Sequence, residues 1–372
     1  MIIRDEIHGN MEFSDLEEKI IDTATFQRLR RIKQMSVANL VYPGATHTRF
    51  EHSLGTAHLT ERIGRKIDLN LDEISKIKLY GLLHDIGHTA FSHEGEDVVK
   101  KYIGNHEELG KKLITSGEIG EIISENYDPK QIAKMGSDKG GLGSIVTSDL
   151  GADRMDYLKR DALNTGVAYG LIDIERLIHT LEFSKAQICI QKRGLESAEF
   201  LLTARFMMFS AVYMHKTVRI ATAMLYRAIE GAILDQTIMQ DDLCKIEDEI
   251  ALWRMTKSEK GGKYAKGIID RDLYKEVYAI SKSQINQKRA KELEEEITKK
   301  FKIDTIVDYP NTYFKPISIK VASENGELEP ITQMSSLVNS LKEAEEQRAE
   351  VIIAASKKDK QKFGKKIIEL IN

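Results

Sequence analysis

The chain has 372 residues, with 55 lysines and arginines against 58 aspartates and glutamates, for a formal net charge of −3. Hydrophobic residues make up 41% of it, which is typical of a globular protein and too high for a disordered one. This balance argues against a strongly basic nucleic-acid binder or a polybasic membrane anchor. Two cysteines are too few for a disulfide framework, and no apolar run suggests a signal peptide or a membrane span, so we expect a cytoplasmic protein.

Apolar residues recur at helical spacing along most of the first 240 residues. They predict helices over 16–35, 50–67, 72–87, 106–114, 120–125, 144–165, 174–183 and 195–236, the last being one long helix or two abutting ones. Asp72 is the expected N-cap of the third helix. Short strands are expected at 187–191, 305–308 and 316–321, an apolar run at 351–355, and a charged amphipathic helix at 284–302. The predicted fold is mostly α: a helical domain over residues 1–255, then a small α+β unit over residues 256–372.

The histidines are concentrated in one part of the sequence. Seven of the ten fall within residues 47–106. A single histidine is usually structural, but a cluster of seven indicates metal binding or proton transfer. In the densest segment, His84 and Asp85 follow an apolar run and His88 comes one helical turn after His84. A buried His-Asp pair is costly without a partner, so a bound cation explains this segment better than a plain helix end.

A fourth ligand is expected from the acidic segment at 149–161. Asp149, Asp153 and Asp156 recur at spacings that place them on one face of a helix, where like charges repel unless a cation compensates. A solvent-exposed helix is the competing interpretation of this segment. The residues alone leave both open.

Together these residues match a known family. His52, His84-Asp85 and Asp153 form the H…HD…D signature of the HD-domain metal-dependent phosphohydrolases. Segments 22–34, 42–55 and 153–157 resemble the SAM-and-HD-domain deoxynucleotide triphosphohydrolases and their prokaryotic relatives, without a SAM domain. The similarity begins at His8-Gly9 and continues more weakly to the last helix. It implies an HD-domain helical core.

The resemblance implies a role for each matching residue. His52, His84, Asp85 and Asp153 would bind one divalent ion (Mn²⁺, Fe²⁺, Ni²⁺, Zn²⁺ or Mg²⁺). The positions near the scissile α-phosphate are His88, His93 and His106. The positions that line the triphosphate channel are Arg49, Tyr157, Arg205 and His215, and those around the deoxyribose are Gln34, Asp161 and Tyr213. Two positions depart from the family: Arg154 replaces the usual lysine beside the metal-binding aspartate and is still expected to bind phosphate, and Met35 replaces a leucine.

The reaction implied is hydrolysis of a dNTP to a deoxynucleoside and triphosphate, as in a dGTPase. Two alternatives are a different HD reaction (a phosphodiesterase, an alarmone hydrolase or a nucleotidase) and a nucleotide-sensing or nucleic-acid-binding protein with a vestigial site. His88 stands where the cyclic-dinucleotide enzymes usually carry lysine, and every metal ligand is present, which favours the dNTP reaction.

Regulation and assembly are also suggested by the resemblance. Asp22, Gln27 and Arg30 match positions that read a guanine activator in regulated relatives, although surface polar residues of a helix explain them equally well. Arg4 replaces an asparagine of the activated relatives, which argues against activation. A homo-oligomer, dimer or tetramer, is expected, with residues 206–214 and the C-terminal unit as candidate interface.

Overall fold

The structure, a computed structural model, describes residues 1–137, 140–310, 317–323 and 325–363 and is mostly α, as predicted. It contains two compact units that are not contiguous in sequence. The first holds residues 1–208, 240–249 and the described part of 316–339, and the second holds 209–239, 250–315 and the described part of 340–372. This division cuts across the boundary expected at residue 255. None of the described helices combines the length and apolarity needed to span a bilayer.

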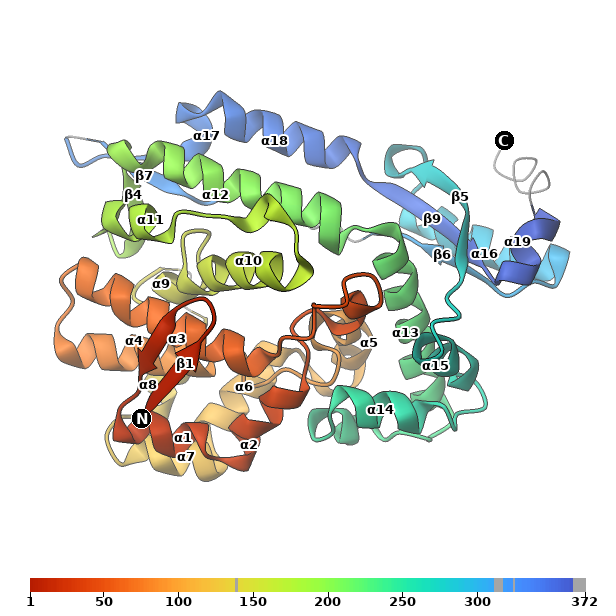
Figure 1. Cartoon of the computed structure of the whole chain (residues 1–372), viewed down its shortest axis with the longest axis horizontal. Coiled ribbons are helices and arrows are strands. Elements are labelled where there is room, and N and C mark those ends of the chain that lie inside the picture. Colours follow the sequence, from red (N-terminus) through yellow and green to blue (C-terminus); the bar gives the residue numbers. More distant parts are fainter. Residues whose placement is uncertain (138–139, 311–316, 324, 364–372) are drawn as a thin grey trace. The chain divides into compact units, whose positions relative to one another are not determined.

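The first unit is mainly helical, and Figure 1 labels its α-helices and the strands β1, β4 and β7. In chain order they are β1 (Ile2–Asp5), β2 (Gly9–Glu12), α1 (Asp15–Ile21), α2 (Ala24–Gln27), the 3₁₀ helices η1 (Arg28–Arg31) and η2 (Ser36–Leu40), α3 (Arg49–Lys66), α4 (Leu71–Leu83), α5 (Ser92–Ile103), α6 (His106–Thr115), α7 (Gly117–Ser124), α8 (Pro129–Lys134), α9 (Ser144–Thr147), α10 (Ala152–Thr165), η3 (Ala168–Gly170), α11 (Ile174–Thr180), β3 (Leu181–Ser184), β4 (Gln187–Gln191), η4 (Lys192–Gly194), α12 (Leu195–Met208), η6 (Gln240–Cys244), β7 (Lys320–Ala322), β8 (Leu328–Pro330) and α17 (Ile331–Met334).

The second unit combines helices with one sheet. Its elements are the π-helical turn η5 (Phe209–Tyr213), α13 (Lys216–Leu234), α15 (Gly262–Ile269), β5 (Lys275–Ser281), η7 (Lys282–Gln284), α16 (Gln287–Phe301), β6 (Thr305–Asp308), β9 (Glu350–Ala355) and α19 (Lys357–Phe363). Two helices, α14 (Asp248–Met255) and α18 (Ser336–Gln347), include the points where the chain passes between units. The sheet has the order β5-β9-β6, with β9 antiparallel to both neighbours, and Leu293 and Ile297 of α16 share a buried cluster with Ile353 of β9.

The described residues of the first unit form two sheets. β1 and β2 form an antiparallel hairpin that pairs Ile2 with Glu12 and Asp5 with Gly9. The second sheet has the order β3-β4-β7-β8, in which β4 pairs in parallel with β7 through Ile190 and Val321. The predicted strands 187–191 and 305–308 are observed as β4 and β6, and 351–355 lies in β9. The strand expected at 316–321 is the shorter β7, and residue 316 lies outside the described residues.

Helices α3 and α4 form the centre of the first unit. α3 packs against α4 and against α10 (Figure 1), and Leu54 and Leu82 lie in one buried cluster. The N-cap of α4 is Asn70 rather than Asp72. The Asn70 side chain accepts a hydrogen bond from the N–H of Glu73 at 2.9 Å, and Glu73 accepts one from Asn70 at 3.1 Å. α4 ends at Leu83, before the predicted end at residue 87, so His84 and Asp85 directly follow the helix.

Two predicted helices are broken. The predicted 16–35 helix is interrupted at Thr23, whose hydroxyl caps α2 by accepting from the N–H of Phe26 at 3.2 Å. The predicted 144–165 helix divides into α9 and α10 at a turn that ends on Gly151. A Cβ on Gly151 would lie 2.2 Å from the carbonyl oxygen of Val146, so this turn requires glycine. Asp149 therefore does not share a helix face with Asp153.

Further differences concern the ends of helices and elements that were not predicted. The predicted 174–183 helix ends at Thr180, after which the chain becomes β3. The 195–236 stretch is two helices, α12 and α13, joined through η5. The hairpin β1–β2, α5 and β5 lie outside the predicted elements, although α5 is clearly amphipathic.

Candidate active site

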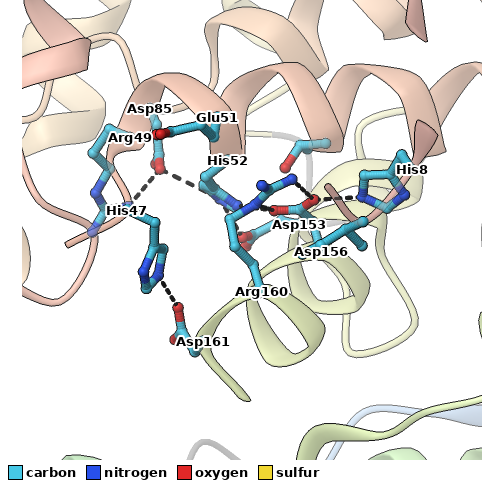
Figure 2. Close-up of polar contacts among 12 residues, drawn as sticks. His8, His47, Arg49, Glu51, His52, Asp85, Asp153, Asp156, Arg160 and Asp161 are labelled. Carbon is cyan, nitrogen blue, oxygen red and sulfur yellow. Dashed lines mark hydrogen bonds and ion pairs between the residues drawn. The ribbon is translucent and has the colours of Figure 1, made fainter. Parts of the chain in front are cut away.

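Four side chains from three segments meet at the centre of the candidate site: His52 of α3, His84 and Asp85 directly after α4, and Asp153 in the first turn of α10. His52 Nε2 lies 3.2 Å from Asp153 Oδ1 and 3.6 Å from Asp85 Oδ2, and His84 Nε2 lies 3.5 Å from Asp85 Oδ1. Figure 2 shows His52, Asp85 and Asp153 together. The structure thus brings the four predicted metal ligands into one place.

The two imidazoles present nitrogen atoms that lack hydrogen bonds. Nε2 of His52 and Nε2 of His84 are both buried and make no hydrogen bond within the described residues. Their other ring nitrogens are engaged: Nδ1 of His52 lies 2.8 Å from Asp156 Oδ2, and Nδ1 of His84 lies 2.8 Å from the carbonyl oxygen of Gly81. A buried polar atom without a partner is costly. One ligand atom each from His52, His84 and Asp153 lies within 4.8 Å of the others, so this group fits a divalent cation.

The carboxylates give this centre a strong attraction for positive charge. Burial by itself lowers the pKa of His52, but contacts with Asp153 and Asp156 outweigh burial and raise it to about 10. The same negative charges that favour a proton on His52 would favour a metal ion, which requires the ring to be neutral.

Asp85 also contacts a buried arginine. Arg49, in the first turn of α3, places Nη1 2.5 Å from Asp85 Oδ2, and its Nε donates to Ser92 Oγ at 3.0 Å. Burial raises the pKa of Asp85, yet Arg49 and the neighbouring imidazoles hold it well below the usual range. Asp85 is therefore ionised and available as a ligand.

A second group of imidazoles lies beside Asp85 and consists of His88, His93 and His106. The rings of His88 and His106 stack at 4.1 Å between centroids, and the ring of His93 stands at 89° to that of His88. His88 Nε2 is buried, makes no hydrogen bond within the described residues, and lies 3.3 Å from Asp85 Oδ1. Glu96 contacts Nδ1 of His93 at 3.2 Å and Nδ1 of His106 at 2.8 Å. These three histidines, predicted to lie near the scissile phosphate, adjoin the metal-ligand group.

Gly87 allows this second group to form. A Cβ at this position would lie 2.1 Å from the carbonyl oxygen of His106 and 2.3 Å from the backbone nitrogen of Gly110. Any other residue would push the His84–His88 turn away from the start of α6. The glycine therefore lets His88 and His106 stack.

The HD domain model matches residues 49–161, which contain all four predicted ligands, and the HD associated region model matches residues 172–372. The second match alone covers more than half of the chain. The chain belongs to the HD-domain family of phosphohydrolases.

Proteins similar to this chain match it over different shares of its length. An uncharacterized protein of Methanocaldococcus jannaschii is 37% identical over 96% of this chain and 79% of its own length. A protein of Dictyostelium discoideum named deoxynucleoside triphosphate triphosphohydrolase SAMHD1 homolog is 31% identical over 75% of this chain and 60% of its own length. The crystal structure of a hypothetical protein from Aquifex aeolicus has a TM-score of 0.81 and 30% identity and covers 99% of both chains.

The residues of this chain that were predicted to bind substrate divide between the two units. Asp161 of α10 pairs with Nε2 of His47 at 2.7 Å, and the N–H of Gln34 donates to the carbonyl oxygen of His47. Arg154 pairs with Asp149, and its Nε is buried without a hydrogen bond in the described structure. Further first-unit members are Tyr157 of α10 and Arg205 of α12. Tyr213 and His215 belong to the second unit, so their place at the site stays a prediction.

The predicted regulatory residues lie on α1, α2 and η1. Asp22 is the exposed C-cap of α1. Gln27 donates to the carbonyl oxygen of Ile21 and accepts from Arg30 Nε, both at 2.8 Å, and the Arg30 guanidinium lies 3.5 Å from the ring centre of Phe50. Gln27 and Arg30 are thus bonded to each other, and a nucleotide-binding role for the three residues remains a prediction.

Sequence reasoning missed two acidic residues that support the site. Glu96 lies three residues after His93 on α5, a spacing that could have identified it. Asp248 has no such signal, because it is distant in sequence: it accepts hydrogen bonds from the N–H of Phe91 at 2.8 Å and of Lys33 at 2.9 Å. Phe91 has a positive φ of 68°, so Asp248 holds the turn that leads into α5.

Proposed function

We propose that this HD protein hydrolyses deoxynucleoside triphosphates to a deoxynucleoside and triphosphate, with dGTPase-like activity. The observation that carries the proposal is the convergence of His52, His84, Asp85 and Asp153 beside a second group of imidazoles. The D. discoideum relative is named for such a reaction, which adds support.

His52, His84, Asp85 and Asp153 would hold one divalent ion, for which Mn²⁺, Fe²⁺, Ni²⁺, Zn²⁺ and Mg²⁺ are candidates. Such an ion, when bound, polarises a phosphate oxygen and lowers the pKa of water. The chain's contribution is to direct the Nε2 atoms of both imidazoles at the ligand group through the partners of their Nδ1 atoms, and to keep Asp85 ionised through Arg49.

Proton transfer falls to the second imidazole group. In the proposed reaction water attacks the α-phosphorus, the bond from phosphorus to the 5′ oxygen breaks, and the leaving oxygen takes a proton. Glu96 engages Nδ1 of His93 and Nδ1 of His106, so Nε2 is the atom of each ring that can give or take that proton. The His93 side chain is 60% exposed, which makes it accessible to a nucleotide, whereas His88 is buried.

The triphosphate needs cations, which this net-acidic chain supplies locally. Arg49 and Arg205 are buried, and Arg154 has a buried Nε without a hydrogen bond within the described residues. Guanidinium groups bind phosphate oxygens in a bidentate manner, so we assign these three arginines to the triphosphate.

The test is to incubate the Mn²⁺-loaded protein with each dNTP and with GTP and to separate the products by anion-exchange chromatography. We expect intact triphosphate and deoxynucleoside in equal amounts. Release of pyrophosphate or single phosphate would instead indicate a different HD reaction. Nucleotide binding without turnover would indicate a sensor.

Sugar selection is assigned to Asp161 and Gln34 of the first unit, and a role for Tyr213 stays an expectation from the resemblance. In this assignment Asp161 accepts the 3′ hydroxyl and fixes the sugar so that a 2′ hydroxyl does not fit, so we expect dGTP to be hydrolysed at least ~100-fold faster than GTP. Asp161→Ala should reduce dGTP turnover while Mn²⁺ content stays at the wild-type level. Equal rates on dGTP and GTP would contradict this assignment.

A further inference from the structure

A buried carboxylate lies directly behind the candidate metal ligand His52. Asp156, one helical turn after Asp153 on α10, places Oδ2 2.8 Å from His52 Nδ1, and both residues are 0% exposed. A histidine that binds a metal through one ring nitrogen usually donates the other N–H to a carboxylate, which fixes the tautomer and the ring orientation. In this arrangement Nδ1–H donates to Asp156, and the Nε2 lone pair points at the ligand group.

Asp156 is itself held from two directions. Arg160, one turn further along α10, donates from Nε to Asp156 Oδ2 and from Nη2 to Oδ1, each at 2.9 Å. His8 Nε2 lies 2.7 Å from Oδ1, so that Asp156 lies between His52 and His8 (Figure 2). Gly55 of α3 leaves room for the Asp156–Arg160 pair, because a Cβ at this position would lie 1.9 Å from Asp156 Oδ1 and 2.6 Å from Arg160 Nη2.

The contacts that run outward from His52 through Asp156 and Arg160 end at the N-terminal hairpin. Arg160 Nη1 donates to Oδ2 of Asp5, the last residue of β1, at 2.9 Å. Asp5 Oδ1 accepts the backbone N–H of Ile7 and of His8, each at 2.9 Å, which shapes the turn that presents His8. The hairpin β1–β2 thus supplies both residues, Asp5 and His8, that fix the Asp156–Arg160 pair from outside.

We propose that the hairpin β1–β2 is part of the metal centre: Asp156 is the positioning residue of His52, and Asp5, His8 and Arg160 hold Asp156 in place. The proposal rests on the metal-binding role assigned to His52 under the proposed function. Buried ion pairs such as those of Arg160 with Asp5 and Asp156 often give no more stability than well-packed apolar residues of the same size. Orientation of a ligand explains why these charges are buried here, and stability alone does not.

The decisive measurement is Mn²⁺ affinity, because a purely structural carboxylate would not affect it. Metal-free Asp156→Asn should bind Mn²⁺ 10- to 100-fold more weakly than wild type by isothermal titration calorimetry, and saturating Mn²⁺ should restore most of the phosphohydrolase activity. Asp5→Asn and His8→Asn, at the outer end, should weaken binding 2- to 10-fold. The double variant of Asp5 and Asp156 should weaken Mn²⁺ binding by a factor smaller than the product of the two single-variant factors, because both residues act through the orientation of His52.

Glu17→Gln is the matched control. Glu17 is also buried, and it pairs at 3.1 Å with Lys78, which donates to the carbonyl oxygen of Glu12 at the end of β2. The variant therefore affects the hairpin at the strand end opposite Asp5 and His8. This variant should lower the unfolding temperature in EDTA and leave Mn²⁺ affinity unchanged. If Asp156→Asn fails to fold, Asp5→Asn and His8→Asn decide the matter.

Wild-type Mn²⁺ affinity in the folded variants of Asp156, or of both Asp5 and His8, would overturn the proposal. A wild-type chain that binds no divalent ion would overturn it together with the proposed function. A wild-type chain that binds Mn²⁺ but hydrolyses no dNTP would refute the reaction alone, and the affinity series would still decide the role of the hairpin.

Discussion

At the scale of single residues, the histidines of the site share one arrangement. Nδ1 of His52 faces a carboxylate, Nδ1 of His84 faces a carbonyl, and Nδ1 of His93 and of His106 both face Glu96. Each ring therefore keeps Nε2 for other chemistry. What that chemistry is depends on the neighbours: carboxylates surround the rings of His52 and His84, whereas the rings of His93 and His106 pack against His88 and each other.

Removing one metal ligand should abolish metal binding without unfolding the chain. His84→Ala is expected to lose Mn²⁺ and activity together, because the remaining ligands hold the ion weakly. α4 keeps its buried Leu79, Leu82 and Leu83, so far-UV circular dichroism should match wild type. Metal analysis after dialysis checks this, and full Mn²⁺ content with wild-type turnover would remove His84 from the site.

Replacing His93 should separate chemistry from metal binding. His93→Ala should keep its Mn²⁺ and lose at least ~100-fold in kcat, as expected when a general acid or base is removed. Steady-state kinetics with dGTP measures kcat and KM, and metal analysis after dialysis measures the Mn²⁺ content. A change confined to KM would assign His93 to binding and make His106 or His88 the better candidate for proton transfer.

The residues of the H…HD…D motif could be predicted because their types and order are unusual, and the structure does bring them together. Asp156 was predicted only to share the acidic helix face from which a fourth ligand was expected, and Glu96 was assigned no role. The function of both depends on the ring nitrogen that they face, which only three-dimensional packing decides. Asp248 holds the turn at Phe91 from a distant segment, and no spacing in the sequence links the two.

At the scale of elements, the ends of helices position the chemistry. α4 stops just before His84, and α10 starts just before Asp153, which places that carboxylate at the positive end of a helix. The sequence period predicted α3 and α4 well because their buried faces are continuous. It failed at Thr23 and Gly151, where a side-chain cap and a close backbone approach interrupt an apolar pattern that otherwise continues.

The contact between the hairpin and α3 should make stability depend on pH. Burial, together with the nearby His8 and Arg62, lowers the pKa of His58 of α3 to about 4. The unfolded chain takes up a proton near pH 6.5 and the folded chain does not, so stability falls as the pH falls from about 6.5 to 4. Over this pH range the free energy of unfolding of His58→Gln should fall by about 1–2 kcal/mol less than that of wild type. The figure is kept small because His58 is only half-buried, so solvent screens its charge.

Urea unfolding of metal-free protein at pH 7.5 and at pH 5 measures this difference. His179→Gln on the exposed face of α11 is the control and should leave the pH dependence as in wild type. An identical loss in the His58 variant and in wild type would show that His58 does not contribute.

At the scale of the whole molecule, metal binding should couple to stability, because the ligands come from α3, α10 and the turn after α4. Mn²⁺ at about 100 times its Kd should stabilise the folded chain by about 2.7 kcal/mol. Differential scanning calorimetry with Mn²⁺ and then with excess EDTA should show the Tm rise and return. His84→Ala should show no rise, and a rise equal to wild type would place the stabilising ion elsewhere.

The parallel pairing of β4 with β7 has a consequence for synthesis of the protein on the ribosome. β4 acquires its neighbour β3 at once, but residue 190 pairs with residue 321, and β8 comes later still. Until that late segment emerges, the growing chain carries a sheet whose buried strand, with Cys189 and Ile190, has one open edge. An open apolar edge recruits other chains. Ribosome-bound intermediates, and any shortened form that stops at residue 255, are therefore the states of this protein most in need of a chaperone.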